Sequence, residues 1–125
     1  LLEGGLRYDT DANGFEFYNG TGWLPLGAYA NVVVTGNGTT LKNKEQAFCN
    51  TTGGAFTITL PSSPVQGDTV RIFDVADTFD SSSLTIARNG NPIMGDSADM
   101  TVTTEGAAFE MVFYDGVQGW RIITI

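Results

Sequence analysis

The sequence predicts an all-β fold, with short antiparallel strands in a small β-sandwich or wrapped β-structure after an N-terminal β-hairpin meander. Three observations predict it. Apolar and polar residues alternate in several short runs, which is the pattern of half-buried strands. Turn-forming residues, among them 16 glycines, separate these runs at intervals of roughly 8–12 residues. An apolar period of about 3.6 residues, which an amphipathic helix needs, persists nowhere in the chain.

Residues 1–27 are predicted to form a meander of two tight hairpins. Strands are expected at 6–9, 15–18 and 23–26, with turns at Asn13-Gly14 and Asn19-Gly20. Asn and Gly tolerate positive φ, which suits the reversal of a twisted hairpin. Isolated hairpins are marginally stable in water, so this segment cannot bury its large apolar side chains by itself. Either the rest of the chain or the same segment of neighbouring chains is expected to cover them.

Residues 28–45 are expected to connect the meander to the main domain. The run of valines in 30–35 predicts a strand that is buried on both faces. Residues 43–46 are the best candidate for a helical turn.

Residues 46–125 are expected to form the main, β-sandwich-like domain. Phe56, Ile58 and Leu60 alternate with small or polar residues, which predicts a half-buried strand that ends at Pro61. Residues 69–75 are apolar on both faces and therefore predict a central strand. Further strands are expected at 83–87, 93–94 and 100–103, followed by a hairpin of 109–114 with 120–124.

One turn pattern occurs twice in the chain. The segment from Tyr18 to Trp23 reads Tyr-Asn-Gly-Thr-Gly-Trp, and that from Tyr114 to Trp120 reads Tyr-Asp-Gly-Val-Gln-Gly-Trp. Both predict a hairpin whose Tyr and Trp flank the turn and pack on one face.

Charge and composition disfavour some classes of function and exclude others. Six Lys and Arg against 14 Asp and Glu give a net charge of −8, which disfavours binding to nucleic acid or to anionic membranes. No apolar run approaches the roughly 18 residues of a membrane span, so membrane insertion is not expected. The absence of His excludes a Ser-His-Asp triad, a His-ligated zinc site and an imidazole base. The lone Cys49, among apolar neighbours, is predicted to be a buried, inert thiol. We expect no enzyme, no catalytic residue and no cofactor.

Two stretches of the chain resemble bacteriophage fibre proteins. The run Leu-Arg-Tyr-Asp-Thr-Asp-Ala-Asn-Gly-Phe-Glu-Phe-Tyr-Asn-Gly-Thr-Gly-Trp, residues 6–23, resembles a short segment common in such proteins. Downstream, residues 51–61, 67–70, 84–90 and 119–122 are similar, in that order, to a C-terminal tail-fibre module. The resemblance implies a β-structured homotrimer in a fibre, spike or adaptor of a virion, in contact with other tail proteins. It supplies no binding residues position by position. Leu at the first position indicates a fragment or processed product.

The function expected from this resemblance is structural, with a host-surface glycan or protein as the receptor. A virion, released by host lysis, is the expected location. A free-standing carbohydrate-binding or adhesin module is the first alternative. A small glycan depolymerase is the second. Its candidate carboxylates lie in two clusters of the sequence, which are Asp74, Asp77 and Asp80, and Asp96 and Asp99.

Two sets of residues are candidates for a site. Tyr18, Trp23, Tyr114 and Trp120 could stack on sugar rings, or could instead cover the core or a subunit interface. Asp9, Asp11 and Asn13 match the first half of a calcium loop with Gly14 at its sixth position. The twelfth position, Gly20, lacks the required carboxylate, so an ordinary hairpin turn is the favoured interpretation.

Overall fold

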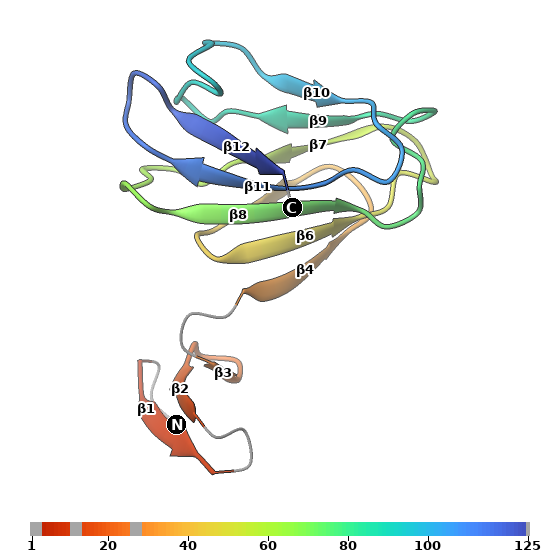
Figure 1. Ribbon diagram of the computed structural model, residues 1–125. Coiled ribbons are helices and arrows are strands. Elements are labelled where there is room, and N and C mark those ends of the chain that lie inside the picture. The colour runs from red at the N-terminus through yellow and green to blue at the C-terminus, as the bar shows by residue number, and fades with distance from the viewer. Residues whose placement is uncertain (1–3, 11–13, 26–28, 125) are drawn as a thin grey trace. The chain divides into compact units, whose positions relative to one another are not determined.

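The computed structural model describes residues 4–10, 14–25 and 29–124. These residues form twelve strands, and no described residue is helical (Figure 1). The all-β prediction is therefore confirmed. The chain divides into two compact units, Leu1–Ala30 and Asn31–Ile125.

The first unit is a three-stranded antiparallel meander. Its strands are β1 (Leu6–Asp9), β2 (Gly14–Tyr18) and β3 (Trp23–Pro25), in the order β1-β2-β3. The register pairs Tyr8 with Phe15 and Tyr18 with Trp23. Both expected hairpins are thus present.

The second unit is a sandwich of two sheets. One sheet has the order β12-β11-β8-β6-β4 and the other the order β10-β9-β7-β5. The strands of the five-stranded sheet are β4 (Ala30–Val34), β6 (Glu45–Cys49), β8 (Thr69–Asp74), β11 (Ala108–Phe113) and β12 (Trp120–Thr124). Those of the four-stranded sheet are β5 (Thr39–Thr40), β7 (Phe56–Thr59), β9 (Leu84–Ala87) and β10 (Met100–Val102). The predicted central strand is β8, the middle member of its sheet.

The chain winds around the core between β4 and β9. Successive strands from β4 to β9 alternate between the two sheets, as Figure 1 shows. Neighbours within a sheet are consequently separated by a full circuit and run in the same direction, as β6–β8, β5–β7 and β7–β9 do. The expected antiparallel pairing holds for β9–β10, β8–β11 and β11–β12. The fold is therefore a sandwich with a wrapped, mixed pairing pattern, rather than a purely antiparallel one.

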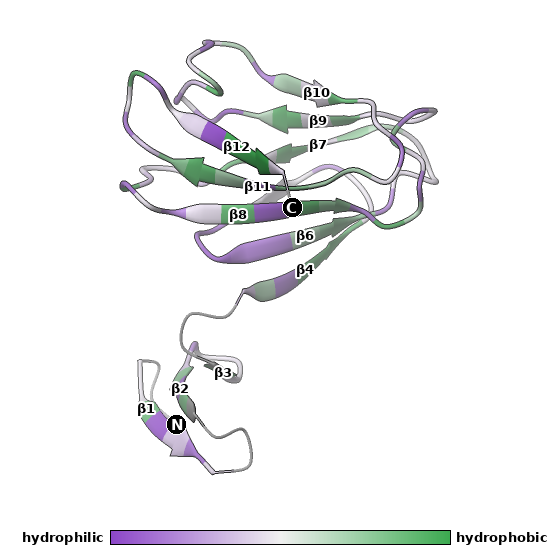
Figure 2. Ribbon diagram, in the orientation of Figure 1, coloured by the Kyte–Doolittle hydropathy of each residue, from purple (hydrophilic) through white to green (hydrophobic). Residues whose placement is uncertain are grey.

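The core lies between the two sheets and follows the predicted alternation. Every second residue of β7, β9 and β11 is buried, and Trp120, Phe79 and Leu60 are among the largest fully buried side chains. Along β8, green bands flank a purple one in Figure 2, and burial follows the same alternation: Val70 and Ile72 are buried, whereas Arg71 between them is half-buried.

The segment 28–45 differs from the expectation in three respects. It contributes the strands β4 and β5 to the two sheets, rather than only connecting units. Only one face of β4 is buried: Val34 lies in the core between the two sheets, whereas Asn31 and Val33, on the opposite face of the strand, are exposed. The predicted helical turn at 43–46 is wrong. Glu45 and Gln46 belong to β6, whose parallel ladder with β8 overrides the local helical preference.

Residues 93–94 were predicted to form a short strand. Only Ile93 takes part in sheet pairing, through isolated bridges to Asp96 and Trp120. In the part of the chain that the structure describes, no helix is long and apolar enough to cross a lipid bilayer.

Candidate functional site

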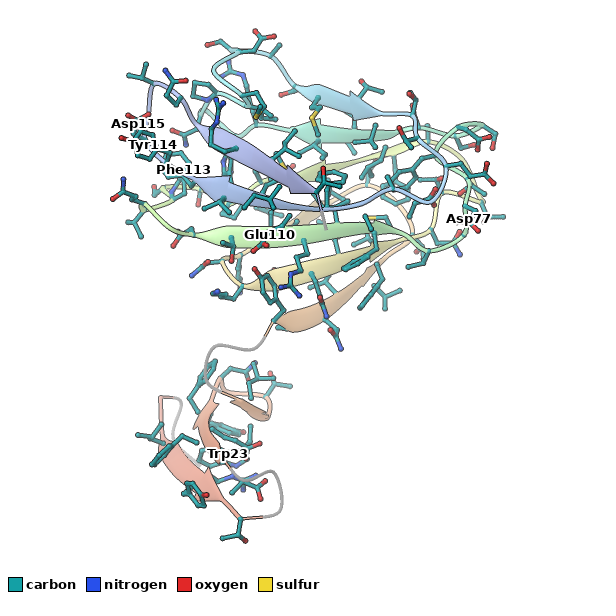
Figure 3. The ribbon with its side chains drawn as sticks, viewed as in Figure 1. Trp23, Asp77, Glu110, Phe113, Tyr114 and Asp115 are labelled. Carbon is teal, nitrogen blue, oxygen red and sulfur yellow. The ribbon has the colours of Figure 1, made fainter. Side chains whose placement is uncertain are left out.

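The turn between β11 and β12 is organised by the side chain of Asp115. One carboxylate oxygen, Oδ1, accepts hydrogen bonds from the backbone amides of Val117 (2.9 Å) and Gln118 (2.6 Å). Below the turn, Tyr114 N–H donates to the carbonyl of Gly119 at 3.0 Å. The turn therefore holds a defined shape at the end of the sandwich where Tyr114 and Asp115 lie (Figure 3).

The equivalent turn of the meander uses the same device. Asn19 Oδ1 accepts hydrogen bonds from the amides of Thr21 and Gly22, both at 2.9 Å. Tyr18 and Trp23 flank it and pack with their ring centroids 5.4 Å apart, as the sequence predicted for this hairpin. Arg7 lies 4.3 Å from the Trp23 ring centroid and forms an ion pair with Glu16 at 2.8 Å.

The second copy of the pattern departs from the prediction. Its turn has one residue more, and a shift of one residue moves a side chain to the opposite face of a strand. Trp120 therefore packs against Phe113, with centroids 5.4 Å apart, instead of against Tyr114. Trp120 is fully buried, so of the two alternatives for this residue the structure shows the core position and not the sugar contact. Tyr114 points outward and is 52% exposed. Tyr18 and Trp23 are half-buried.

Tyr114 borders a hollow on the outer face of the five-stranded sheet. Its volume is about 540 Å³, and its lining includes Gln66, Gly67, Val112, Tyr114, Gln118 and Arg121. Val112 and Arg121 are register partners on β11 and β12. The loop before β8 is held beside them by two hydrogen bonds with Phe113: Gly67 N–H donates to the Phe113 carbonyl, and Phe113 N–H donates to that of Asp68, both at 2.9 Å. We call this feature the Tyr114 hollow.

Of the residues in the Tyr114 hollow, the sequence predicted only Tyr114. Arg121 could have been predicted as an outward-facing residue, because it follows the buried Trp120 in β12 and strand alternation puts it on the other face of the sheet. Gln66 could not, because it comes from a loop that only the tertiary fold brings beside β11.

Asp74 has a structural role that the sequence did not reveal. It is buried at the end of β8, where its carboxylate accepts hydrogen bonds from the amides of Thr78 (3.1 Å), Phe79 (3.0 Å) and Gly106 (3.0 Å). Burial alone would raise the pKa of Asp74, but these amides and that of Ala76 outweigh it, so the pKa is lowered. Asp74 thus ties the loop after β8 to the loop before β11.

The calcium half-loop falls largely outside the described residues. Asp11 and Asn13 lie outside the described residues, and Asp9 lies in β1 with its carboxylate 3.8 Å from the Arg7 guanidinium. Among the residues that the structure describes, no three or more His, Cys, Asp or Glu side chains are grouped so that they could hold a metal ion.

The meander presents one face that is wholly apolar. Cross-strand pairing puts five side chains on it: Leu6, Tyr8, Phe15, Phe17 and Leu24. Tyr8 and Phe15 pack edge to face at 5.1 Å. Even so, Leu6, Tyr8 and Phe15 remain 63%, 51% and 54% exposed. We call this set the apolar face of the meander.

Comparisons with known proteins give no family assignment. No protein-family model matches this chain, and no curated protein has a sequence that matches it significantly.

Proposed function

We propose that this chain is a segment of a homotrimeric bacteriophage tail fibre, spike or related virion protein, with a structural role and a host-surface glycan as its ligand. The observation that carries the proposal is the apolar face of the meander, and the resemblance of residues 6–23 to phage fibre segments supports it. The sandwich unit, and the absence of helix from the residues that the structure describes, agree with a fibre module of this kind.

The exposure of the apolar face is costly for a solitary chain. Burying a large apolar side chain stabilises a protein by about 1.5–3 kcal/mol, and three such side chains here are more than half exposed. Among the described residues of this unit, the three-stranded meander is a single layer with no second layer packed on it. Contact between copies would cover the face and would also protect the unpaired edges of β1 and β3.

Light scattering coupled to size exclusion tests the proposal on the full chain. The expected mass is that of three chains. Replacing Tyr8 and Phe15 together by Ser should shift the mass towards one chain, because it removes much of the apolar face. Val65→Ser is the matched control, since Val65 is 66% exposed but lies in the sandwich unit.

A wild-type chain that is a stable monomer with well-formed strands by circular dichroism would contradict the proposal. A trimer that survives both Ser substitutions would show that the apolar face is not the contact between chains.

A free-standing carbohydrate-binding or adhesin module is the second candidate. The Tyr114 hollow favours it, because an exposed aromatic ring beside amide groups is a suitable surface for a sugar. Binding of a glycan by a monomer, lost in Tyr114→Ala, would support this function over the trimeric fibre.

A further inference from the structure

We infer that the Tyr114 hollow is a binding site for an acidic saccharide, in which a sugar ring stacks on Tyr114 and its carboxylate pairs with Arg121. The inference rests on the glycan-binding part of the proposed function and names the class of glycan. It does not depend on the number of chains in the assembly.

The hollow is built by the fold rather than by a loose surface side chain. Its floor lies on the outer face of the sheet, where Val112 is paired with Thr69 on one side and with Arg121 on the other. Asp115 fixes the turn that carries Gln118 on one rim. The pairing of Gly67 with Phe113 fixes the loop that carries Gln66 on the other. Both rims are therefore preorganised, which lowers the entropic cost of binding.

Tyr114 provides the apolar contact. Tyr114 is 52% exposed and its backbone is hydrogen-bonded to Gly119, so an aromatic surface is available beside the hollow on an ordered stretch of backbone. Tyrosine loses little side-chain entropy when it binds, and it combines an apolar ring with a polar hydroxyl. The C–H groups on one face of a pyranose can pack on such a ring, while the Gln66 and Gln118 amides can exchange hydrogen bonds with its hydroxyl groups.

Arg121 sets the charge of the ligand. It is the only charged side chain in the lining of the hollow, and it forms no ion pair with any of the described carboxylates. Its Nη1 donates a long hydrogen bond of 3.5 Å to Gln118 Oε1. Arg binds carboxylates through two parallel hydrogen bonds, which makes a carboxylate-bearing sugar the best match.

The acids in the adjoining loops are already engaged. Asp68 Oδ2 accepts a hydrogen bond from the Val65 amide, and Asp115 Oδ1 accepts two from its own turn. These contacts hold the two carboxylates to their backbones. The net charge of −8 repels an anion at long range, but this repulsion is screened beyond about 8 Å at physiological ionic strength. The ion pair with Arg121 therefore decides whether the hollow prefers an acidic or a neutral saccharide.

Isothermal titration calorimetry on the full chain tests this with two probes, trigalacturonic acid and the corresponding neutral galactotriose. We expect the acidic trisaccharide to bind about tenfold more tightly. Arg121→Gln should remove that preference, and Arg121→Lys should retain part of it because the charge remains. Tyr114→Ala should weaken the binding of both probes. Arg88→Gln is the control, because Arg88 is a cation outside the hollow, and it should leave both affinities unchanged.

Three results would overturn the inference. Equal affinity for the two trisaccharides, unchanged in Arg121→Gln, would exclude the acidic class. Inorganic phosphate bound as tightly as trigalacturonic acid would reduce the site to a simple anion site. No binding of either trisaccharide at millimolar concentration would remove the site altogether. A trimer found by light scattering would stand in each case, so failure here is distinguishable from failure of the fibre proposal.

Discussion

Gly119 lies so close to Pro92 that it has no room for a side chain: a Cβ at Gly119 would stand 1.8 Å from the Pro92 carbonyl oxygen. The adjacent Trp120 N–H donates a hydrogen bond of 2.8 Å to that same oxygen. Gly119 also has a φ of +68°, in the left-handed region. This contact joins the loop after β9 to the start of β12 and seats Trp120 in the core.

We therefore predict that Gly119→Ala destabilises the sandwich by at least about 2 kcal/mol, because the left-handed backbone is strained and the Pro92 loop must move. Urea unfolding followed by Trp fluorescence measures the change. Gly116→Ala is the matched control in the same turn, since its Cβ would meet nothing within 4 Å and its φ is not positive. Equal stability of the two variants would contradict the prediction.

The lowered pKa of Asp74 predicts that the free energy of unfolding depends on pH. Its pKa in the folded chain is below the ordinary value of 3.8, so the folded state binds the proton less readily than the unfolded state does. The stabilisation is present above pH 3.8 and is lost as the pH falls through the lowered pKa. Asp74→Asn should cost about 1–3 kcal/mol at neutral pH, because an amide nitrogen would face backbone donors.

The difference in unfolding free energy between wild type and Asp74→Asn should shrink between neutral pH and about pH 3. Asp80→Asn, at an exposed position in the same loop, serves as the control and should change stability little at either pH. A difference that stays constant with pH would argue against the role of the Asp74 charge.

Cys49 is predicted to be unreactive in the folded chain. It is fully buried, and burial, with a smaller contribution from the Asp74 charge, raises the pKa of its thiol to about 12. A disulfide reagent such as Ellman's should label it only as fast as the chain unfolds. Val117→Cys adds a thiol at a position that is 71% exposed, and it should give one fast and one slow reaction. Immediate labelling of wild type would contradict the prediction.

The local features of this fold were predictable from the sequence. The meander hairpins follow from turn residues such as Asn19, whose side chain caps the turn, and strand β7 follows from the alternation of Phe56 and Ile58. These patterns are encoded by residues close together in the chain, so neither depends on the rest of the fold. The sequence also allowed Trp120 to be predicted as a core residue, because it lies in an apolar strand.

Only the tertiary structure decided which distant segments meet. Parallel pairing of β6 with β8 turned an expected helical turn into a strand, because the ladder supplied hydrogen bonds that the local sequence did not specify. One additional residue in the C-terminal turn sent Tyr114 outward and left Phe113 to pack with Trp120. The Tyr114 hollow needed this turn together with the loop at Gln66. A periodic pattern fixes which face of a strand is apolar, but the neighbours of that strand are chosen by packing over the whole chain.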